Sequence, residues 1–196
     1  MSRKIPEILY KEEQELLLSQ FNTRYPTQER NRTMIKLMLD TGLRLAEVIN
    51  LKRNHIYLEG DVNRLKVKEG KGAKDRTLWI AKKSVEYLSS WRKRQKEEVA
   101  KRNERNNLNL VFSTLKGNKL HPRNVRQMMY NYSNKAAIKK VNPHMLRHTF
   151  ATDFLRETKN IRMVQKALGH ADISTTMIYT HIVDDELENA MKNLRK

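Results

Sequence analysis

The chain has 196 residues, with 40 Lys and Arg against 22 Asp and Glu, which gives a formal net charge of +18. This length fits one domain, and the charge points to a polyanion; the spread of basic residues along the chain favours nucleic acid over an anionic membrane surface. The absence of cysteine excludes a disulfide framework, a cysteine nucleophile and a thiolate metal site, and the short apolar runs predict a soluble, cytoplasmic protein.

Helical patterns dominate the first fifty residues. Residues 10–21 predict a short helix with an acidic first turn, and residues 27–41 predict a second helix with an apolar side. Gly42 is the expected C-terminal stop of this second helix. A third, short helix is expected from about Arg44 to Leu51.

The pattern changes to that of strands between residues 54 and 81. His55 to Leu58, the alternating Leu65 and Val67, and residues 77–80 are three strand candidates, separated by glycine-containing turns. We therefore predict a small antiparallel sheet in this part of the chain.

The rest of the chain again predicts helices. A long, very basic helix is expected over residues 82–105, then a brief extended piece at 110–112 and a helix over 122–137. Asn142 as N-cap and Pro143 in the first turn predict the start of another helix, which runs to about Glu157.

Shorter helical segments are expected near the C-terminus. Residues 161–168 predict a helix that Gly169 ends, and Ser174 or Thr175 is expected to cap a further short helix. A final helix is expected over residues 184–194. The predicted fold class is mainly α with a small antiparallel β-sheet (α+β).

Groups suited to anion chemistry occur at several separate points, and each alone has an ordinary structural explanation. Arg44 and Glu47 stand at i and i+3 and can form a surface salt bridge. Lys71 lies between glycines at a hairpin tip, where a lysine is usually only solvated. His170 follows a helix-ending glycine, and Tyr179 is a lone aromatic of the kind that packs half-buried.

A more unusual group lies at the predicted start of the helix that follows Asn142. His144 and Arg147 stand at i and i+3, and we expect them to converge with free backbone N–H groups on an anion such as phosphate. His144 and His148 also have the i, i+4 spacing of a zinc site. Met145 argues against a metal, because the zinc-hydrolase motif needs Glu at that position.

In this order and spacing the groups resemble the tyrosine recombinase or integrase family, most closely the catalytic domain of the Xer-type recombinases and related phage and mobile-element integrases. The resemblance spans the chain from about residue 6 onward. It rests on five segments: Thr41 to Glu47, Gly70-Lys71-Gly72, His144 to Thr152, Leu168-Gly169-His170, and Ser174 to Tyr179.

The resemblance implies a site-specific recombinase that cleaves and rejoins DNA through a covalent 3′-phosphotyrosyl intermediate. It implies Tyr179 as nucleophile and Lys71 as general acid. The other implied catalytic residues act at the scissile phosphate with Glu47 in support, and they are Arg44, His144, Arg147 and His170. No metal and no nucleotide cofactor is expected.

The resemblance also implies partners. They are double-stranded DNA and further copies of the chain assembled on paired sites, with nucleoid association when DNA is bound. Residues 184–196 are expected to dock on a neighbouring protomer; the alternative is that their apolar side folds onto its own core. The long basic helix is expected to contact DNA phosphates, and the alternative is a solvated helix of mixed charge.

Family members usually carry a separate N-terminal DNA-binding domain. We therefore expect residues 1–196 to be a single catalytic domain with the core-binding domain absent, either as an excised domain or as a short single-domain member. Three other functions are weighed: relaxation of supercoils by a type IB topoisomerase-like reaction, non-catalytic DNA binding, and non-specific coating of nucleic acid. The size and the spacing from Leu168-Gly169-His170 to Tyr179 favour recombination over the topoisomerase-like reaction, and the presence of all six expected catalytic groups argues against the two non-catalytic functions.

Overall fold

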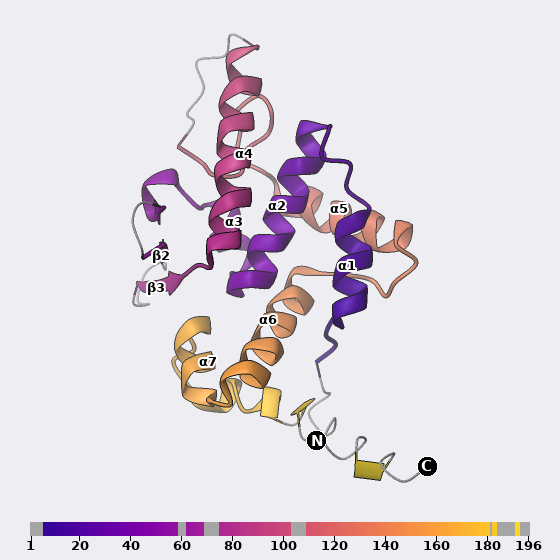
Figure 1. Cartoon of the computed structure of the whole chain (residues 1–196), viewed down its shortest axis with the longest axis vertical. Coiled ribbons are helices and arrows are strands. Elements are labelled where there is room, and N and C mark those ends of the chain that lie inside the picture. The colour runs from indigo at the N-terminus through magenta and orange to yellow at the C-terminus, as the bar shows by residue number, and fades with distance from the viewer. Residues whose placement is uncertain are drawn as a thin grey trace.

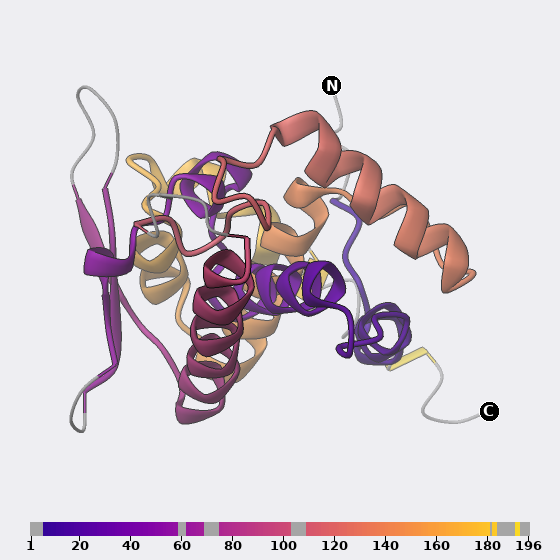
Figure 2. The same cartoon turned by 90° about the horizontal axis from the view of Figure 1, so that it is seen from above.

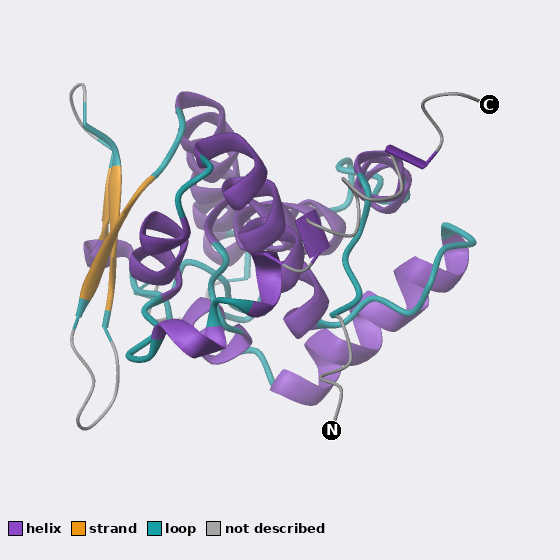
Figure 3. Ribbon diagram, turned by 90° about the horizontal axis from the view of Figure 1, so that it is seen from below, coloured by secondary structure: helices purple, strands orange, loops and turns teal. Residues whose placement is uncertain are grey.

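A computed structural model of the chain describes residues 6–58, 62–68, 75–102, 109–180, 182–183 and 191–192. Helices form most of it, and a small antiparallel sheet stands at one edge with the helices on one side of it (Figures 2 and 3). The predicted fold class is confirmed. Within the described residues, no helix is both long and apolar enough to cross a membrane.

The first three predicted helices are present. They are α1 (Lys11–Ser19), α2 (Pro26–Thr41) and α3 (Leu45–Ile49). The second of them is central, because α2 packs against α1, α4 and α6 (Figure 1). Met34, Ile35 and Met38 of α2 are fully buried, as the apolar side of that segment predicts.

The sheet has the strand order β1-β2-β3, with β1 (Ile56–Tyr57), β2 (Arg64–Val67) and β3 (Arg76–Trp79). Leu65 lies opposite Leu78, and both are buried under the helices. Arg76 occupies an inward position of β3 and is buried as well. A buried arginine on the apolar face of a strand needs partners, and they lie in the functional site described below.

After the sheet come α4 (Lys82–Ala100), α5 (Pro122–Lys135), α6 (Pro143–Thr158) and α7 (Ile161–Leu168). The predicted N-cap of α6 is confirmed, since the Asn142 side chain accepts hydrogen bonds from two backbone N–H groups of the first turn. The predicted stop at Gly169 is also confirmed, because this residue ends α7 in the left-handed conformation. The predicted extended piece at 110–112 makes one bridge, from Leu110 to Lys52.

Of two predictions near the C-terminus, the cap of the short helix is wrong and the tail helix is described only in part. A 3₁₀ turn, η2 (Ile173–Thr175), follows α7, but Asp172 caps it rather than Ser174 or Thr175; the Asp172 carboxylate accepts the N–H of Ser174 at 2.9 Å. Aspartate is as good an N-cap as serine, and it comes first in the chain. Of the expected tail helix, residues 191–192 are helical and the rest of 184–194 lies outside the described residues.

The buried side chains form two clusters. The larger joins α1 to α5 and the start of α6 with the sheet, and the smaller joins the rest of α6 and α7 to the segment that follows η2. Tyr179 belongs to the smaller cluster, where it packs with Ala151, Leu155 and Val164. Of the predicted site residues, His144 and Arg147 lie on α6, and His170 and Tyr179 lie in the segment that follows α7.

Gly42 ends α2, as predicted, and permits a close approach of three helices. Its φ of +64° lies in the left-handed region. A Cβ atom here would stand 2.3 Å from Cδ1 of Phe150 and 3.0 Å from Cδ2 of Leu168. The end of α2 therefore lies directly against α6 and α7, and only glycine allows this conformation and contact together.

We expect Gly42→Ala to lower the free energy of unfolding by about 2 kcal/mol, because it adds left-handed strain to a steric clash. Urea unfolding measures this. In a double-mutant cycle, Phe150→Leu should offset part of the loss by relieving the clash. A Gly42→Ala protein within about 0.5 kcal/mol of the wild type would show that the three helices separate at little cost.

Candidate active site

Arg44 and Glu47 form the pair that their spacing predicts. Arg44 stands just before α3, and its backbone N–H donates to Oε2 of Glu47 at 2.7 Å. Its guanidinium Nη1 donates to Oε1 at 3.1 Å. The Arg44 side chain is 43% exposed and that of Glu47 only 10%. The carboxylate therefore holds an arginine that still reaches solvent.

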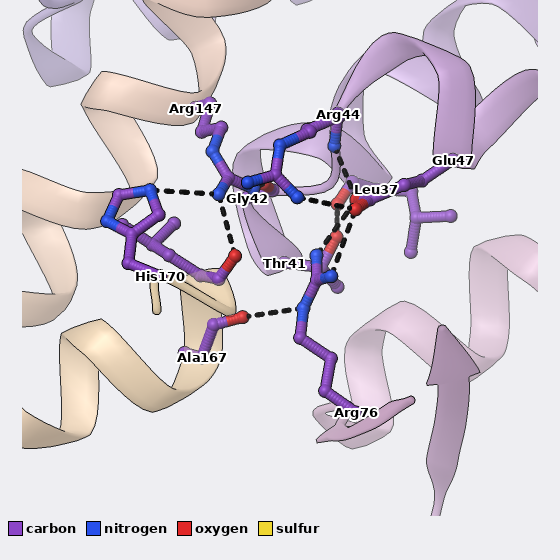
Figure 4. Close-up of polar contacts among 10 residues, drawn as sticks. Leu37, Thr41, Gly42, Arg44, Glu47, Arg76, Arg147, Ala167 and His170 are labelled. Carbon is purple, nitrogen blue, oxygen red and sulfur yellow. Dashed lines mark hydrogen bonds and ion pairs between the residues drawn. The ribbon is translucent and has the colours of Figure 1, made fainter. Parts of the chain in front are cut away.

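The same carboxylate binds a second arginine, which the sequence did not suggest. Arg76 donates from Nη1 to Oε1 of Glu47 at 2.9 Å and from Nη2 to Oε2 at 2.8 Å (Figure 4). Its Nε donates to the carbonyl of Ala167 at 3.0 Å. Burial by itself raises the pKa of Glu47, but the hydrogen bonds and charge of Arg76 outweigh this and hold it below its usual value.

Arg147 is held by two helix ends. Its Nη1 donates to the carbonyl of Gly42 at the end of α2, at 2.5 Å, and its Nη2 donates to the carbonyl of Leu168 at the end of α7, at 2.7 Å. The residue is 5% exposed. Burial and the nearby charge of Arg44 lower its pKa to about 10, so the guanidinium stays charged at neutral pH.

His170 lies beside Arg147 and stays neutral. Its Nε2 is 3.2 Å from Nη2 of Arg147, and its Nδ1 is 3.0 Å from Oγ1 of the fully buried Thr176. Because a guanidinium only donates, Nε2 must accept and the ring proton sits on Nδ1. Burial first, and then the charge of Arg147, lower the pKa of His170 to about 4.

These contacts bring together four predicted residues and Arg76 as a fifth member. The four are Arg44, Glu47, Arg147 and His170. Two guanidiniums bind one carboxylate and a third, that of Arg147, is held by carbonyls close by, which leaves an excess of two positive charges around a half-exposed Arg44. Arg147 and His170 both feel the charge of Arg44, so the groups are mutually close. Such a cluster attracts an anion and can form the bidentate hydrogen bonds that phosphate oxygens accept.

Tyr179 lies at the side of this cluster and is 2% exposed. Its hydroxyl is 3.0 Å from Nδ1 of His148, the residue that directly follows Arg147 in α6. Burial raises the pKa of the Tyr179 phenol, while the charge of Arg147 opposes this increase. Burial and the neighbouring His144 lower the pKa of His148 to about 4, so the histidine is neutral at neutral pH.

His144 lies in the first turn of α6. It is exposed and lines an open hollow with Pro6, Glu7 and Asn142. The expectation that free N–H groups of this turn are available to an anion is wrong, and the convergence of His144 with Arg147 on a phosphate stays a prediction. The Asn142 side chain accepts the N–H groups of His144 and Met145, each at 3.0 Å, so the cap that starts the helix uses those donors.

Lys71 lies outside the described residues, so its place in the site stays a prediction. The two arms of its hairpin are described, and they are joined by an ion pair between Lys66 and Asp75 at 3.3 Å. These arms belong to β2 and β3, the latter of which carries Arg76. The hairpin that bears Lys71 is therefore attached to the arginine cluster by its own strand.

Sequence reasoning missed two members of this site. Arg76 occupies an inward position of β3, where the alternation of inward and outward residues leads one to expect an apolar side chain. This mismatch between position and residue type is the sequence signal that could have identified it. His148 was weighed only as a metal ligand beside His144. Within the residues that the structure describes, His, Asp and Glu form no group of three or more that could hold an ion. The expected absence of a metal stays a prediction.

Comparison with known sequences gives consistent matches along the chain. The Phage integrase family matches residues 7–186. The chain is 34% identical over 193 residues to the tyrosine recombinase XerC of Halalkalibacterium halodurans, and this match covers 97% of the chain and 62% of XerC. It is 35% identical over 193 residues to XerA of Thermococcus kodakarensis, covering 98% and 64%. The chain thus spans less than two thirds of these relatives.

Solved structures agree with the sequence matches. The XerH site-specific recombinase bound to palindromic difH substrate, in a post-cleavage complex, has a TM-score of 0.81 and 30% identity, covering 98% of this chain and 54% of that one. The XerA recombinase has a TM-score of 0.78 and 30% identity, covering 100% and 67%. The catalytic domain of bacteriophage HP1 integrase shares the fold at a TM-score of 0.64 and 23% identity, covering 96% and 95%.

The matched sequence region contains the three guanidiniums, the carboxylate, His170 and Tyr179, and the matched structures have the same arrangement of helices and sheet. The chain belongs to the phage integrase family and has the tyrosine recombinase catalytic-domain fold.

Proposed function

We propose that the chain is a site-specific DNA recombinase that cleaves and rejoins strands through a covalent 3′-phosphotyrosyl intermediate. The observation that carries this proposal is a group of three guanidiniums with a buried tyrosine beside it; two of the guanidiniums bind one carboxylate and the third is held by two carbonyls. The proposed setting is the cytoplasm, with association to the nucleoid when DNA is bound.

Arg44 and Arg147 are the proposed ligands of the scissile phosphate. Arg44 reaches solvent, and the two carbonyls that orient Arg147 leave its charge uncompensated. Negative charge builds on the non-bridging oxygens in the transition state, and preorganised guanidiniums stabilise it. His170 acts with Arg147; because its Nε2 accepts from Arg147 here, it can donate to phosphate only after that contact opens and Nε2 gains a proton.

In the proposed reaction, Oη of Tyr179 forms a bond to phosphorus, and the bond from phosphorus to the 5′-oxygen breaks. The phenol loses its proton, for which the exposed His144 is the proposed acceptor or relay, and the 5′-oxygen gains one from Lys71. The phosphotyrosyl bond keeps the energy of the broken phosphodiester, so the reverse attack of a 5′-hydroxyl needs no cofactor.

The DNA surface is proposed to include basic residues of α4, but part of this helix is internally neutralised. Glu98 is buried and lies within 3.6 Å of Arg94, 3.1 Å of Lys101 and 2.9 Å of Arg102. The end of α4 therefore offers less net positive charge to DNA than its lysines and arginines indicate. This observation supports the alternative of a mixed-charge helix for that segment.

Tyr179→Phe should abolish covalent adducts with DNA while folding and DNA affinity survive, because it removes only the nucleophilic hydroxyl. The measurement is trapping on a nicked suicide duplex, followed by mapping of the linked residue. Tyr87→Phe is the matched control, since it also removes a hydroxyl with one side-chain partner, Asp40 at 2.8 Å. It should form adducts normally. An adduct formed by Tyr179→Phe would contradict the assignment.

Lys71→Ala should slow cleavage by removing the proton donor for the departing 5′-oxygen. A substrate with sulfur at the 5′-bridging position leaves well without a proton, so it should restore most of the cleavage rate. The same substrate should not restore Arg147→Ala, whose defect lies in stabilising charge on the non-bridging oxygens. Equal restoration of both variants, or of neither, would remove Lys71 from the general-acid role.

Assembly of several protomers on paired DNA sites is also proposed. The XerH structure holds a palindromic substrate, and a palindrome presents two equivalent half-sites to two copies of a protein. In this chain Met191 is 64% exposed, so it does not pack onto its own core. This exposure supports docking of the tail, residues 184–196, on a neighbouring protomer.

Deletion of residues 184–196 separates docking on a neighbour from packing on the chain's own core. If the tail docks on a neighbour, the truncated protein should keep its melting transition and still cleave suicide substrates, but lose strand exchange between two DNA sites. Binding and cleavage of single sites, measured in parallel, control for damage to the catalytic site. Loss of the melting transition would show that the tail stabilises its own protomer.

A further inference from the structure

Arg76 is a buried cation of β3 that contacts two other elements of the candidate site. It is 9% exposed, although it is charged at neutral pH and lies on the apolar side of the sheet. Its guanidinium extends away from β3 to Glu47 of α3 and to the carbonyl of Ala167 in α7 (Figure 4). One side chain thus ties together three elements that are far apart in the sequence.

Each of these elements holds or adjoins a residue of the proposed reaction. Glu47 holds both the backbone and the guanidinium of Arg44. Ala167 directly precedes Leu168, whose carbonyl holds Arg147. The strand of Arg76 itself forms one arm of the hairpin on which Lys71 is predicted. A shift of Arg76 would therefore reach both arginines and the hairpin.

The geometry requires arginine rather than another cation. Two parallel N–H bonds match the two oxygens of Glu47, and a third N–H, on Nε, turns toward Ala167. The point charge of a lysine cannot fill these three positions together. Loss of the guanidinium would also leave the buried carboxylate of Glu47 with Arg44 as its only described ion-pair partner.

From these contacts we infer that Arg76 is a positioning residue for the phosphate-binding arginines. It fixes Glu47 as an ionised acceptor and holds the end of α7 in place, and so it sets the relative positions of Arg44 and Arg147 without touching DNA. The inference deepens the proposed function and rests on it. Small displacements of preorganised groups cost about 10²-fold in rate, and loss of outer contacts costs a similar factor.

The first arm of the test needs no DNA, so its result does not depend on the proposed activity. Amide hydrogen exchange is compared among the wild type, Arg76→Gln and Arg76→Lys. Exchange should become faster in residues 44–50 and 161–170, while the rest of the protein keeps its protection. Uniform acceleration in proportion to lost stability would overturn the inference, because it would indicate a general structural role.

Arg30→Lys is the matched control. Arg30 also donates through Nε and both Nη atoms, to Asn31 and to the carbonyl of Ser113 at 3.1 Å, but it lies away from the site. It should accelerate exchange near residue 113 and leave cleavage within about twofold of the wild type. A cleavage loss in Arg30→Lys equal to that in Arg76→Lys would also overturn the inference.

The second arm measures single-turnover cleavage of a suicide duplex together with DNA affinity. Arg76→Gln should cleave about 10²-fold more slowly and Arg76→Lys about tenfold more slowly, with DNA affinity within about twofold of the wild type. If Arg76→Gln does not fold, Arg76→Lys carries both arms. A parallel loss of affinity, or unchanged cleavage, contradicts a positioning role.

A double-mutant cycle with Arg44→Lys distinguishes positioning from stability. If Arg76 acts through Arg44, the double variant Arg44→Lys/Arg76→Lys should cleave faster than the product of the two single losses predicts. Multiplicative losses would overturn the inference. If the wild type forms no covalent adduct at all, the proposed function fails and the reaction-positioning role fails with it. The exchange arm still shows whether Arg76 orders residues 44–50.

Discussion

The site depends on one carboxylate that accepts four N–H groups. Glu47 receives the backbone N–H and guanidinium of Arg44 and two parallel bonds from Arg76. With two oxygens and about four lone-pair positions, a carboxylate can accept this number and little more. The Glu47 carboxylate reduces the repulsion between the guanidiniums of Arg44 and Arg76. Because the neighbouring Arg147 is held by carbonyls and not by a second carboxylate, the cluster keeps the positive charge that an anion needs.

Arg147 illustrates a different way of holding a cation. The carbonyls of Gly42 and Leu168 end α2 and α7, where unpaired carbonyl groups carry the partial negative charge of the helix dipole. They orient the guanidinium without neutralising it as a second carboxylate would. This arrangement requires both helix ends to approach α6 closely, and the left-handed Gly42 makes that approach possible. The left-handed conformation of Gly42 thus lets carbonyl groups hold Arg147, and the positive charge of its guanidinium is kept at the site.

The sequence was informative wherever one local rule decided the outcome. Asn142, Gly42 and Gly169 set helix boundaries as predicted, and the spacing of Arg44 and Glu47 gave their ion pair. It was misleading where two rules competed for the same groups: Asn142 caps α6, so the N–H groups expected to bind an anion are already used. Arg76 and the hydrogen bond of His148 with Tyr179 depend on contacts between distant segments, which no local pattern encodes.

The proposed nucleophile, Tyr179, lies in a different environment from Arg147, although adjacent residues of α6 place both: Arg147 belongs to α6, and Tyr179 contacts the next residue, His148. Consecutive helical residues point about 100° apart, so Arg147 faces the two helix ends while His148 faces Tyr179. The tyrosine and histidine meet as neutral groups in an apolar cluster, where burial raises the pKa of the phenol. Close by, the charge of Arg147 acts in the opposite direction. In the proposed reaction, activation of the phenol requires that its hydroxyl exchange the imidazole of His148 for the phosphate and its guanidiniums, so the proposed phenolate would form only when DNA is bound.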